Sequence, residues 1–267
     1  MTSESAALRL AATLILLRST SEIPLQTLMV VRHKAMAFAS GAIVFPGGSA
    51  DQGDRALAEA MAGGAPPTMT TEEIVVRIAA IRETFEESGI LLAHDRETRA
   101  PVAPDVAAKL VGLCRQSADR DAVDFAAAMD AENLVPAIDR LTPFARWITP
   151  PIRPKRFDTH FFIAETPPEQ TLLHDGNEAV DAIWIAPQAV IDETGAGRFK
   201  LVFATRMNLV RLANASSPAV AIASARDTPI VSVMPEFIET ADGPAIRIPA
   251  AAGYGGDVFP VIDPPAM

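Results

Sequence analysis

Short runs of apolar residues, several of them rich in β-branched and aromatic side chains, recur along the chain and predict buried β-strands. They cover residues 13–17, 27–31, 42–45, 159–164 and 181–186. The segments between these runs carry helical patterns. This alternation of strand and helix signals predicts a mixed α/β fold.

Residues 74–92 form the segment with the clearest helical period. Its apolar side chains recur at helical spacing and predict a buried stripe, made of Ile74, Ile78, Ile81 and Phe85. Glu83, Glu86 and Glu87 fall on the opposite side. The upstream stretch 62–73 ends in Thr and Glu residues typical of a helix N-terminus, and Gly89 is a natural stop.

The three glutamates raise a question of charge. At i, i+3 and i+4 spacing their carboxylates lie on adjoining turns, where like charges repel unless something compensates. A hard divalent cation would do so, and Arg82, four residues before Glu86, neutralises part of the charge. The alternative is an acidic face that is simply solvated.

Two further regions depart from this alternation. Residues 101–140 are rich in Ala, Leu, Asp and Arg, which predicts two helices inserted beside the strands. After residue 216 proline and glycine become more frequent, with strand-like runs at 230–234 and 245–249. No internal repeat and no long linker stands out.

Composition narrows the possible partners and compartment. The 267 residues are 49% hydrophobic and 21% charged, as is ordinary for a globular protein. A net charge of −10 argues against binding nucleic acid, because bulk phosphate contact needs excess Lys and Arg. The single cysteine, Cys114, excludes an internal disulfide and favours a reducing, cytoplasmic setting. The apolar stretch 8–17 is too short to span a membrane and is broken by Arg9, so we expect a strand there.

One combination of residues is specific enough to indicate a family. The chain resembles the Nudix hydrolases, whose signature is G-x5-E-x7-R-E-U-x-E-E-x-G-U with U an apolar residue. The matching positions are Gly48, Asp54, Arg82, Glu83, Glu86, Glu87, Gly89 and Ile90.

The match has three departures. Between Asp54 and Arg82 stand 27 residues instead of seven, so we expect a loop insertion at about 55–73. Thr84 takes a position that is usually apolar. Asp54 replaces a glutamate and has a shorter side chain. The lengthened segment that follows it leaves the role of Asp54 open.

Flanking segments indicate a branch of the family. Residues 28–54 resemble the motif that precedes the Nudix signature in coenzyme A diphosphatases, including Arg32 and the Phe-Pro-Gly-Gly run from Phe45. Residues 144–164 resemble the animal acyl-CoA diphosphatases of the nucleoside diphosphate-linked moiety X motif 19 type. The likeness covers about 8–210, leaving 211–267 as a C-terminal extension that we expect to pack on the domain.

The resemblance implies a Nudix α/β/α sandwich with a mixed sheet that uses Mg²⁺ or Mn²⁺. It implies metal ligation by Glu83, Glu86, Glu87 and the Gly48 carbonyl, with Glu86, Glu87 and Arg82 as the catalytic residues. Substrate-binding residues are then expected among Arg32, Phe45, Gly47, Gly48, Asp51 and Arg156. The turn at Gly47 would face the diphosphate, with Asp51 and Asp54 at its edge. The general base is either Glu86 or an acid outside the signature such as Glu178.

The activity implied is hydrolysis of coenzyme A or acyl-CoA to 3'-phosphoadenosine 5'-phosphate and the corresponding 4'-phosphopantetheine. The alternative within the family is hydrolysis of ADP-ribose, NADH or dinucleotide polyphosphates. A non-catalytic nucleotide-binding Nudix domain is a third possibility, which loss of the glutamates would have favoured, and all three are present. We expect a small-molecule substrate, no nucleic-acid or membrane partner, and a possible homodimer.

Overall fold

A mixed sheet of eight strands forms the centre of the computed structural model, which describes residues 6–32, 41–61, 69–116, 125–172 and 179–261. Its strand order is β10-β7-β8-β1-β2-β3, with β4 paired to β1 and β9 paired to β2. The strands are β1 (Leu8–Arg18), β2 (Gln26–Arg32), β3 (Ile43–Val44), β4 (Gly47–Ser49), β7 (Thr142–Ile148), β8 (Arg156–Glu165), β9 (Ala179–Ile185) and β10 (Ser232–Val233). Every strand predicted from the five apolar runs is present in this sheet.

The central strand β1 shows why the sheet is covered on both faces. Its side chains alternate in direction, so Leu14 and Leu16 enter one core and Ile15 and Leu17 enter the other, and all four are fully buried. β1 runs parallel to β8 over ten residue pairs and antiparallel to β2 and β4. A strand buried on both faces reads as a continuous apolar run, as residues 13–17 do.

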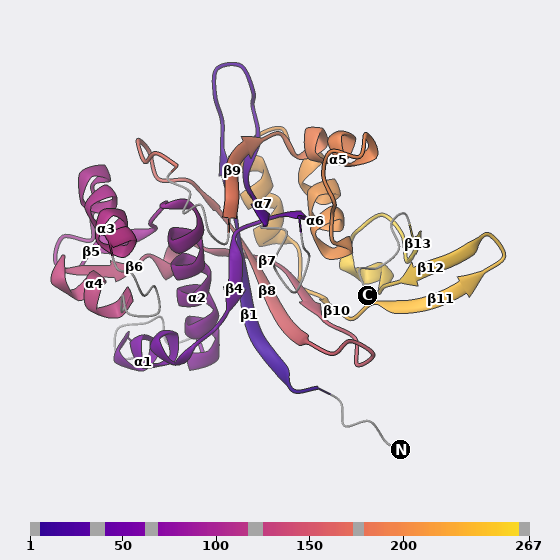
Figure 1. The fold of residues 1–267 in the computed structure, drawn as a ribbon, viewed down its shortest axis with the longest axis horizontal. Helices are drawn as coiled ribbons and strands as arrows, with labels where there is room; N and C mark the ends of the chain where they lie inside the picture. Colours follow the sequence, from indigo (N-terminus) through magenta and orange to yellow (C-terminus); the bar gives the residue numbers. More distant parts are fainter. Residues whose placement is uncertain (1–5, 33–40, 62–68, 117–124, 173–178, 262–267) are drawn as a thin grey trace.

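Helices lie on both sides of the sheet and complete an α/β/α sandwich (Figure 1). One side carries α1 (Gln52–Met61), α2 (Thr71–Ser88), α3 (Pro104–Gln116) and α4 (Phe125–Ala131). The other carries α5 (Pro187–Gly195), α6 (Phe203–Ala213) and α7 (Pro218–Asp227). The α/β class and the sandwich architecture predicted from the sequence are thereby confirmed.

The expected loop insertion at 55–73 is in part helical, which corrects that prediction. α1 occupies its first part and α2 begins at Thr71, while residues 62–68 lie outside the described residues. α1 forms because Asp51 and Asp54 each accept the other's backbone N–H at its first turn, and because Ala58 packs into the core.

The segment predicted as a helical insertion, 101–140, contains α3 and α4 and two further elements. β6 (Leu134–Pro136) pairs antiparallel with β5 (Ala93–Asp95), and the short 3-10 helix η2 (Ile138–Arg140) follows. Leu110, Phe125 and Met129 join the core that α2 shares with the sheet. The insertion therefore packs against α2.

Both ends of α2 are capped. At the start, Thr70 accepts the N–H of Glu73 and Glu73 bonds back to the N–H of Thr70, which is a capping box. At the end, Gly89 adopts the left-handed conformation with φ 77° and donates to Phe85.

The single buried stripe predicted for α2 is too narrow. The four stripe residues are buried as expected, and so are others around the helix, including Val75, Ala79 and Thr84. The reason is that α2 lies between the sheet on one side and the added elements α1, α3 and η2 on the others.

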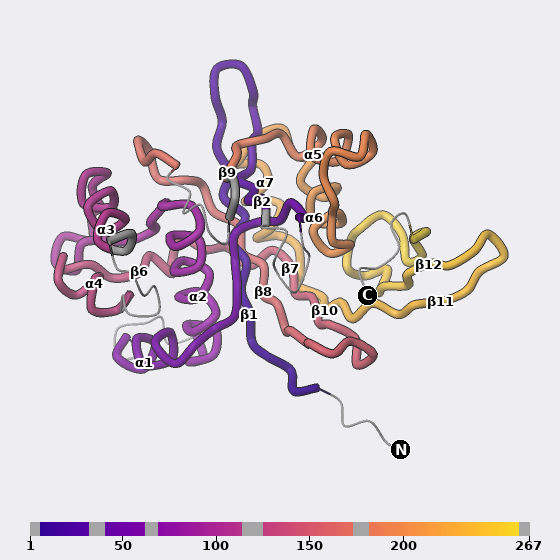
Figure 2. The backbone as a smooth tube through the Cα atoms, viewed as in Figure 1, coloured from indigo at the N-terminus to yellow at the C-terminus, as the bar shows by residue number. Residues whose placement is uncertain are grey.

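The last part of the chain forms a separate antiparallel sheet of β11 (Glu236–Thr240), β12 (Gly243–Arg247) and β13 (Val258–Pro260). Figure 2 shows the β11–β12 hairpin extending away from the rest of the chain. Ile246 and Ile248 at its base join the core behind the main sheet. There, after η3 (Ala250–Ala252), the Tyr254 hydroxyl accepts from Trp147 and donates to Asn208. In the parts of the chain described, no helix combines the length and apolar character that crossing a bilayer requires.

Candidate active site

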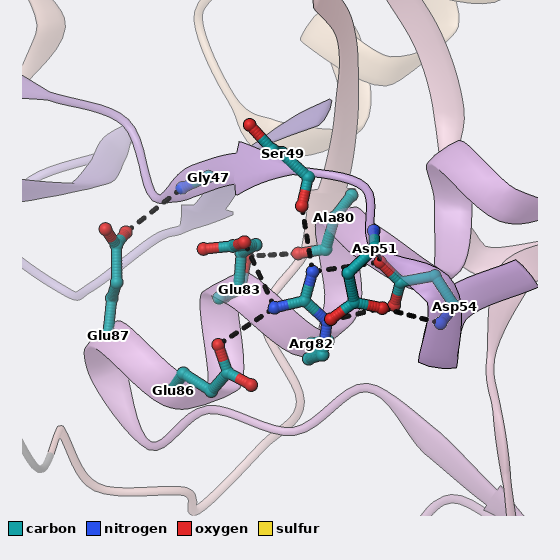
Figure 3. A network of polar contacts seen from close by, with 10 residues as sticks. Gly47, Ser49, Asp51, Asp54, Ala80, Arg82, Glu83, Glu86 and Glu87 are labelled. Carbon is teal, nitrogen blue, oxygen red and sulfur yellow. Dashed lines mark hydrogen bonds and ion pairs between the residues drawn. The ribbon is translucent and has the colours of Figure 1, made fainter. Parts of the chain in front are cut away.

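The candidate site lies where the short strand β4 crosses the C-terminal half of α2 (Figure 3). β4 is held against β1 by the pairs Thr13 with Gly47 and Ala12 with Gly48. The backbone of these glycines therefore faces the turns of α2 that carry the glutamates.

Close packing explains why both positions on β4 are glycine. Gly47 has φ +155°, and a Cβ there would lie 2.4 Å from the carbonyl oxygen of Ala12. A Cβ on Gly48 would lie 2.4 Å from the carboxyl group of Glu83. Only glycine lets the strand approach the sheet and the helix this closely.

Arg82 is the centre of the polar network. Its Nε and Nη2 donate to the two carboxylate oxygens of Asp54, both at 2.9 Å, and Nη2 also donates to the carbonyl oxygen of Ser49 at 3.0 Å. Its Nη1 donates to Glu83 and to Glu86, both at 3.0 Å. Burial alone would lower the pKa of Arg82, but the bond to Asp54 and the surrounding negative charges raise it above its usual value.

Asp51 and Asp54 have different surroundings, although the sequence places them together at the edge of the turn. Asp54 is 1% exposed and binds Arg82 on the buried side of the network. Asp51 is 54% exposed in its side chain and lies 3.6 Å from Nε of Arg82. The expectation of an edge position therefore fits Asp51 and is wrong for Asp54.

The three glutamates on α2 have different partners. Glu83 is partly exposed, Glu86 is 46% exposed in its side chain, and Glu87 is buried with Oε2 accepting the N–H of Gly47 at 3.0 Å. Arg82 holds Glu83 and Glu86, whereas the N–H of Gly47 bonds Glu87. Among the described residues, no three His, Cys, Asp or Glu side chains form a ready-made metal cluster.

The pKa of Glu86 is shifted by its position in this network. Its pKa is raised to about 7, chiefly because the surrounding protein partly desolvates the carboxyl, although the side chain remains 46% exposed. Arg82 opposes this shift, while the negative charges of Glu83 and Asp54 add to it.

Two of the expected substrate-binding residues lie elsewhere. The Phe45 side chain is 3% exposed and packs in the core on the far face of the sheet, so the structure does not support a direct contact between its ring and a substrate. Arg156 lies at the start of β8, opposite Leu8, and donates to the backbone carbonyls of Thr149 and Ala6. It is not part of the network in Figure 3.

Other expected residues are described only in part or not at all. Arg32 ends β2, and its side chain is not described. Glu178, the candidate base outside the signature, lies outside the described residues.

Sequence reasoning missed two contributions to the site. The Ser49 carbonyl is a backbone acceptor for Arg82, which no side-chain pattern reveals. Thr84, at a position that is usually apolar, is fully buried, and its hydroxyl donates to the carbonyl oxygen of Ala80 at 2.7 Å. This bond within the helix satisfies the hydroxyl and makes Thr84 compatible with the core.

Comparison with known proteins gives three findings. The family model described as the NUDT19 Nudix domain matches residues 57–202, more than half of the chain. The putative nudix hydrolase 7 of Caenorhabditis elegans is 28% identical over 193 residues, which cover 72% of this chain and 56% of that protein. The acyl-coenzyme A diphosphatase NUDT19 of Gallus gallus is 33% identical over 161 residues, 54% of this chain and 42% of that protein.

A solved structure agrees with these matches. A NUDIX hydrolase from Alicyclobacillus acidocaldarius is similar with a TM-score of 0.66 and 28% identity, covering 82% of this chain and 97% of that one. The matches span about half the length of the two curated relatives named above. The family match includes Arg82 and the three glutamates of α2, and the β4 glycines precede it. On this evidence the chain belongs to the NUDT19 Nudix domain family.

Proposed function

We propose that this protein is a divalent-metal-dependent diphosphatase that hydrolyses coenzyme A or acyl-CoA to 3'-phosphoadenosine 5'-phosphate and the corresponding 4'-phosphopantetheine. The observation that carries the proposal is the polar network of the site, in which Arg82 donates to the carboxylates of Glu83 and Glu86 on α2 and the Glu83 carboxylate packs beside Gly48 of β4. The family match and the name of the Gallus gallus relative support the choice of substrate.

The donor set of the site fits Mg²⁺ or Mn²⁺. Glu83, Glu86 and Glu87 supply only oxygen, the ligand type that hard divalent cations prefer. Gly48 leaves the space beside the Glu83 carboxyl free of a Cβ, so its carbonyl is a further candidate ligand. When bound, such an ion would shield the negative phosphate oxygens and favour deprotonation of the attacking water.

The protein's own contribution is to hold these carboxylates in place. Arg82 orients Glu83 and Glu86 through one nitrogen, and the N–H of Gly47 orients one oxygen of Glu87. Groups that are already oriented need less reorganisation when substrate binds, which favours the reaction.

Hydrolysis requires a group that accepts a proton from water. An oxygen of water bonds to one phosphorus, the bridging P–O bond breaks, and the second phosphate leaves. We assign this role to the Glu86 carboxylate, which lies beside Glu83 at the same guanidinium nitrogen of Arg82. Glu178 is the alternative base.

Contacts to the substrate are proposed from the resemblance. The backbone at Gly47 and Gly48 would face the diphosphate, with Asp51 beside it. The 3'-phosphate of coenzyme A calls for basic groups, for which Arg32 is the candidate.

The test is a substrate panel followed by mass spectrometry of the products. The protein is incubated with Mg²⁺ and coenzyme A, acetyl-CoA, a long-chain acyl-CoA, ADP-ribose, NADH or diadenosine polyphosphates. We expect 3'-phosphoadenosine 5'-phosphate from the CoA compounds. Cleavage of only ADP-ribose, NADH or the dinucleotides would contradict the substrate assignment and keep the diphosphatase chemistry, whereas no cleavage at all would favour a binding domain.

A further inference from the structure

Gln170, from the segment between β8 and β9, contacts the chain just beyond α2. Its Oε1 accepts the N–H of Leu91 at 2.8 Å, and its Nε2 donates to the carbonyl oxygen of the same residue at 3.0 Å. The amide side chain thus bonds both polar groups of one residue, as a neighbouring strand would. Since Leu91 is fully buried, these two bonds satisfy backbone groups that have left water.

A series of hydrogen bonds connects this contact to the last turn of α2. Gly89 donates to Phe85, and the Ser88 hydroxyl donates to the Thr84 carbonyl oxygen at 2.6 Å while accepting the N–H of Ile90 at 3.2 Å. The next residue is Leu91, fixed by the side chain of Gln170. The end of α2 is therefore held by the local hydrogen bonds of Ser88 and by Gln170, which lies 79 positions beyond Leu91 in the chain.

The backbone before Gln170 gives an independent indication that this contact is fixed. Glu169 has φ 64°, in the left-handed region that side chains other than glycine rarely adopt. Such a conformation persists where the surrounding structure determines it. Before Glu169 the N–H of Thr166 donates to the carbonyl oxygen of Leu17, and after it Leu172 packs against the core of α2, so the segment is anchored on both sides.

We propose that Gln170 is a positioning residue for the metal-binding carboxylates: by fixing Leu91 it holds the last turn of α2, and with it Glu86 and Glu87. This inference rests on the proposed function, because it assumes that these carboxylates bind the metal. Removing a group that hydrogen-bonds a metal ligand typically changes metal affinity 10- to 100-fold. Because Gln170 acts through the backbone at Leu91, we expect an effect at the lower end of this range.

The experiment measures Mn²⁺ binding in the absence of substrate, from the electron paramagnetic resonance signal of free Mn²⁺. Wild type is compared with Gln170→Met, which keeps the length of the side chain and loses both bonds. The matched control is Gln188→Met on α5, which removes an exposed bond to Asp192 on the opposite side of the sheet. Circular dichroism first establishes that each variant is folded.

We expect the dissociation constant for Mn²⁺ to rise about tenfold in Gln170→Met and to stay unchanged in Gln188→Met. Hydrogen exchange at the amide of Leu91 should be faster in Gln170→Met. Gln170→Glu, which keeps an oxygen able to accept from Leu91, should recover part of the affinity, and it replaces the first variant if that one does not fold.

Two results would overturn the inference in distinguishable ways. Equal Mn²⁺ affinity in wild type and in folded Gln170→Met, or in Gln170→Glu where that variant replaces it, would show that Gln170 does not position the ligands, while the metal-dependent function would stand. Absence of Mn²⁺ binding in wild type would remove the proposed metal function itself, and this inference with it.

Discussion

Arg82 makes more hydrogen bonds within the candidate site than any other side chain shown in Figure 3. It donates to Asp54, Glu83, Glu86 and the Ser49 carbonyl oxygen. A buried arginine needs such partners, because its charge has lost most of its contact with water and each lost partner leaves that charge less well compensated. Asp54 is the most buried of its acidic partners. Although aspartate has a shorter side chain than the usual glutamate, Asp54 still reaches two guanidinium nitrogens.

Asp54→Asn should therefore lower both stability and activity. The amide lacks the charge that Arg82 requires, and we expect a loss of about 3 kcal/mol in the free energy of unfolding, measured with urea. Asp51→Asn is the matched control, because the Asp51 side chain is about half exposed and its carboxylate makes a longer contact, 3.6 Å, with Nε of Arg82. This substitution should lower the free energy of unfolding by less than about 1 kcal/mol. Equal losses in the two variants would contradict the distinction between them.

Gly48→Ala tests the close approach of β4 to α2. The added Cβ would lie 2.4 Å from the Glu83 carboxyl, so that carboxyl must move, and we expect turnover to fall while the protein remains folded. Gly112→Ala on α3 is the control. A Cβ there meets nothing within 4 Å, and alanine in a helix should stabilise the protein by about 0.5–1 kcal/mol without affecting turnover.

At the scale of single residues, the sequence indicated which side chains make up the site better than it indicated what surrounds each of them. The signature residues on α2 could be named because charge and spacing are visible in the sequence. That Phe45 turns into the far core could not, since the direction of a side chain next to β4 depends on strand pairing between distant segments. The Ser49 carbonyl was invisible for a similar reason, because every residue has one.

At the scale of elements, α2 carries the site and its capping determines where it begins. Thr70 and Glu73 satisfy each other's backbone N–H groups in the first turn. The sequence predicted this helix start and the stop at Gly89 because capping is local chemistry. It did not predict α1 within the insertion, where a helix of ten residues is stabilised by packing on α2 that only the folded chain provides.

Thr70→Ala should destabilise the protein by about 1 kcal/mol, because the Glu73 N–H loses its acceptor. Chemical denaturation measures the loss, and Ser217→Ala at the start of α7 is a control with the same kind of cap. Turnover per folded molecule should not change in either variant, since the cap lies more than two turns from Glu83. A large loss of turnover in folded Thr70→Ala would contradict this separation.

At the scale of the whole molecule, the sheet separates the candidate site from a second core. Behind the sheet, Trp147, Tyr254 and Asn208 form a buried chain of hydrogen bonds that ties the C-terminal part to β7 and α6. The sequence predicted the sandwich from the alternation of strands and helices. It could not reveal this connection, which joins residues more than one hundred positions apart.

Tyr254→Phe should reduce stability and spare catalysis. Without the hydroxyl, the Trp147 indole N–H and the Asn208 carbonyl oxygen lose their partner, and we expect a loss of about 2 kcal/mol in the free energy of unfolding. Turnover measured on the folded protein should match wild type. A selective fall in turnover would show that the two faces of the sheet are coupled.

The most direct test of the central claim is release of 3'-phosphoadenosine 5'-phosphate from coenzyme A, measured as Mg²⁺ is titrated into metal-free protein. Wild type is compared with Glu87→Gln and with Glu239→Gln, an exposed substitution on β11. Metal-dependent release by wild type and Glu239→Gln, with a fall of at least about a hundredfold in Glu87→Gln, is the predicted result. Equal release by all three proteins, or release independent of Mg²⁺, would contradict the assignment of the α2 carboxylates as the metal site.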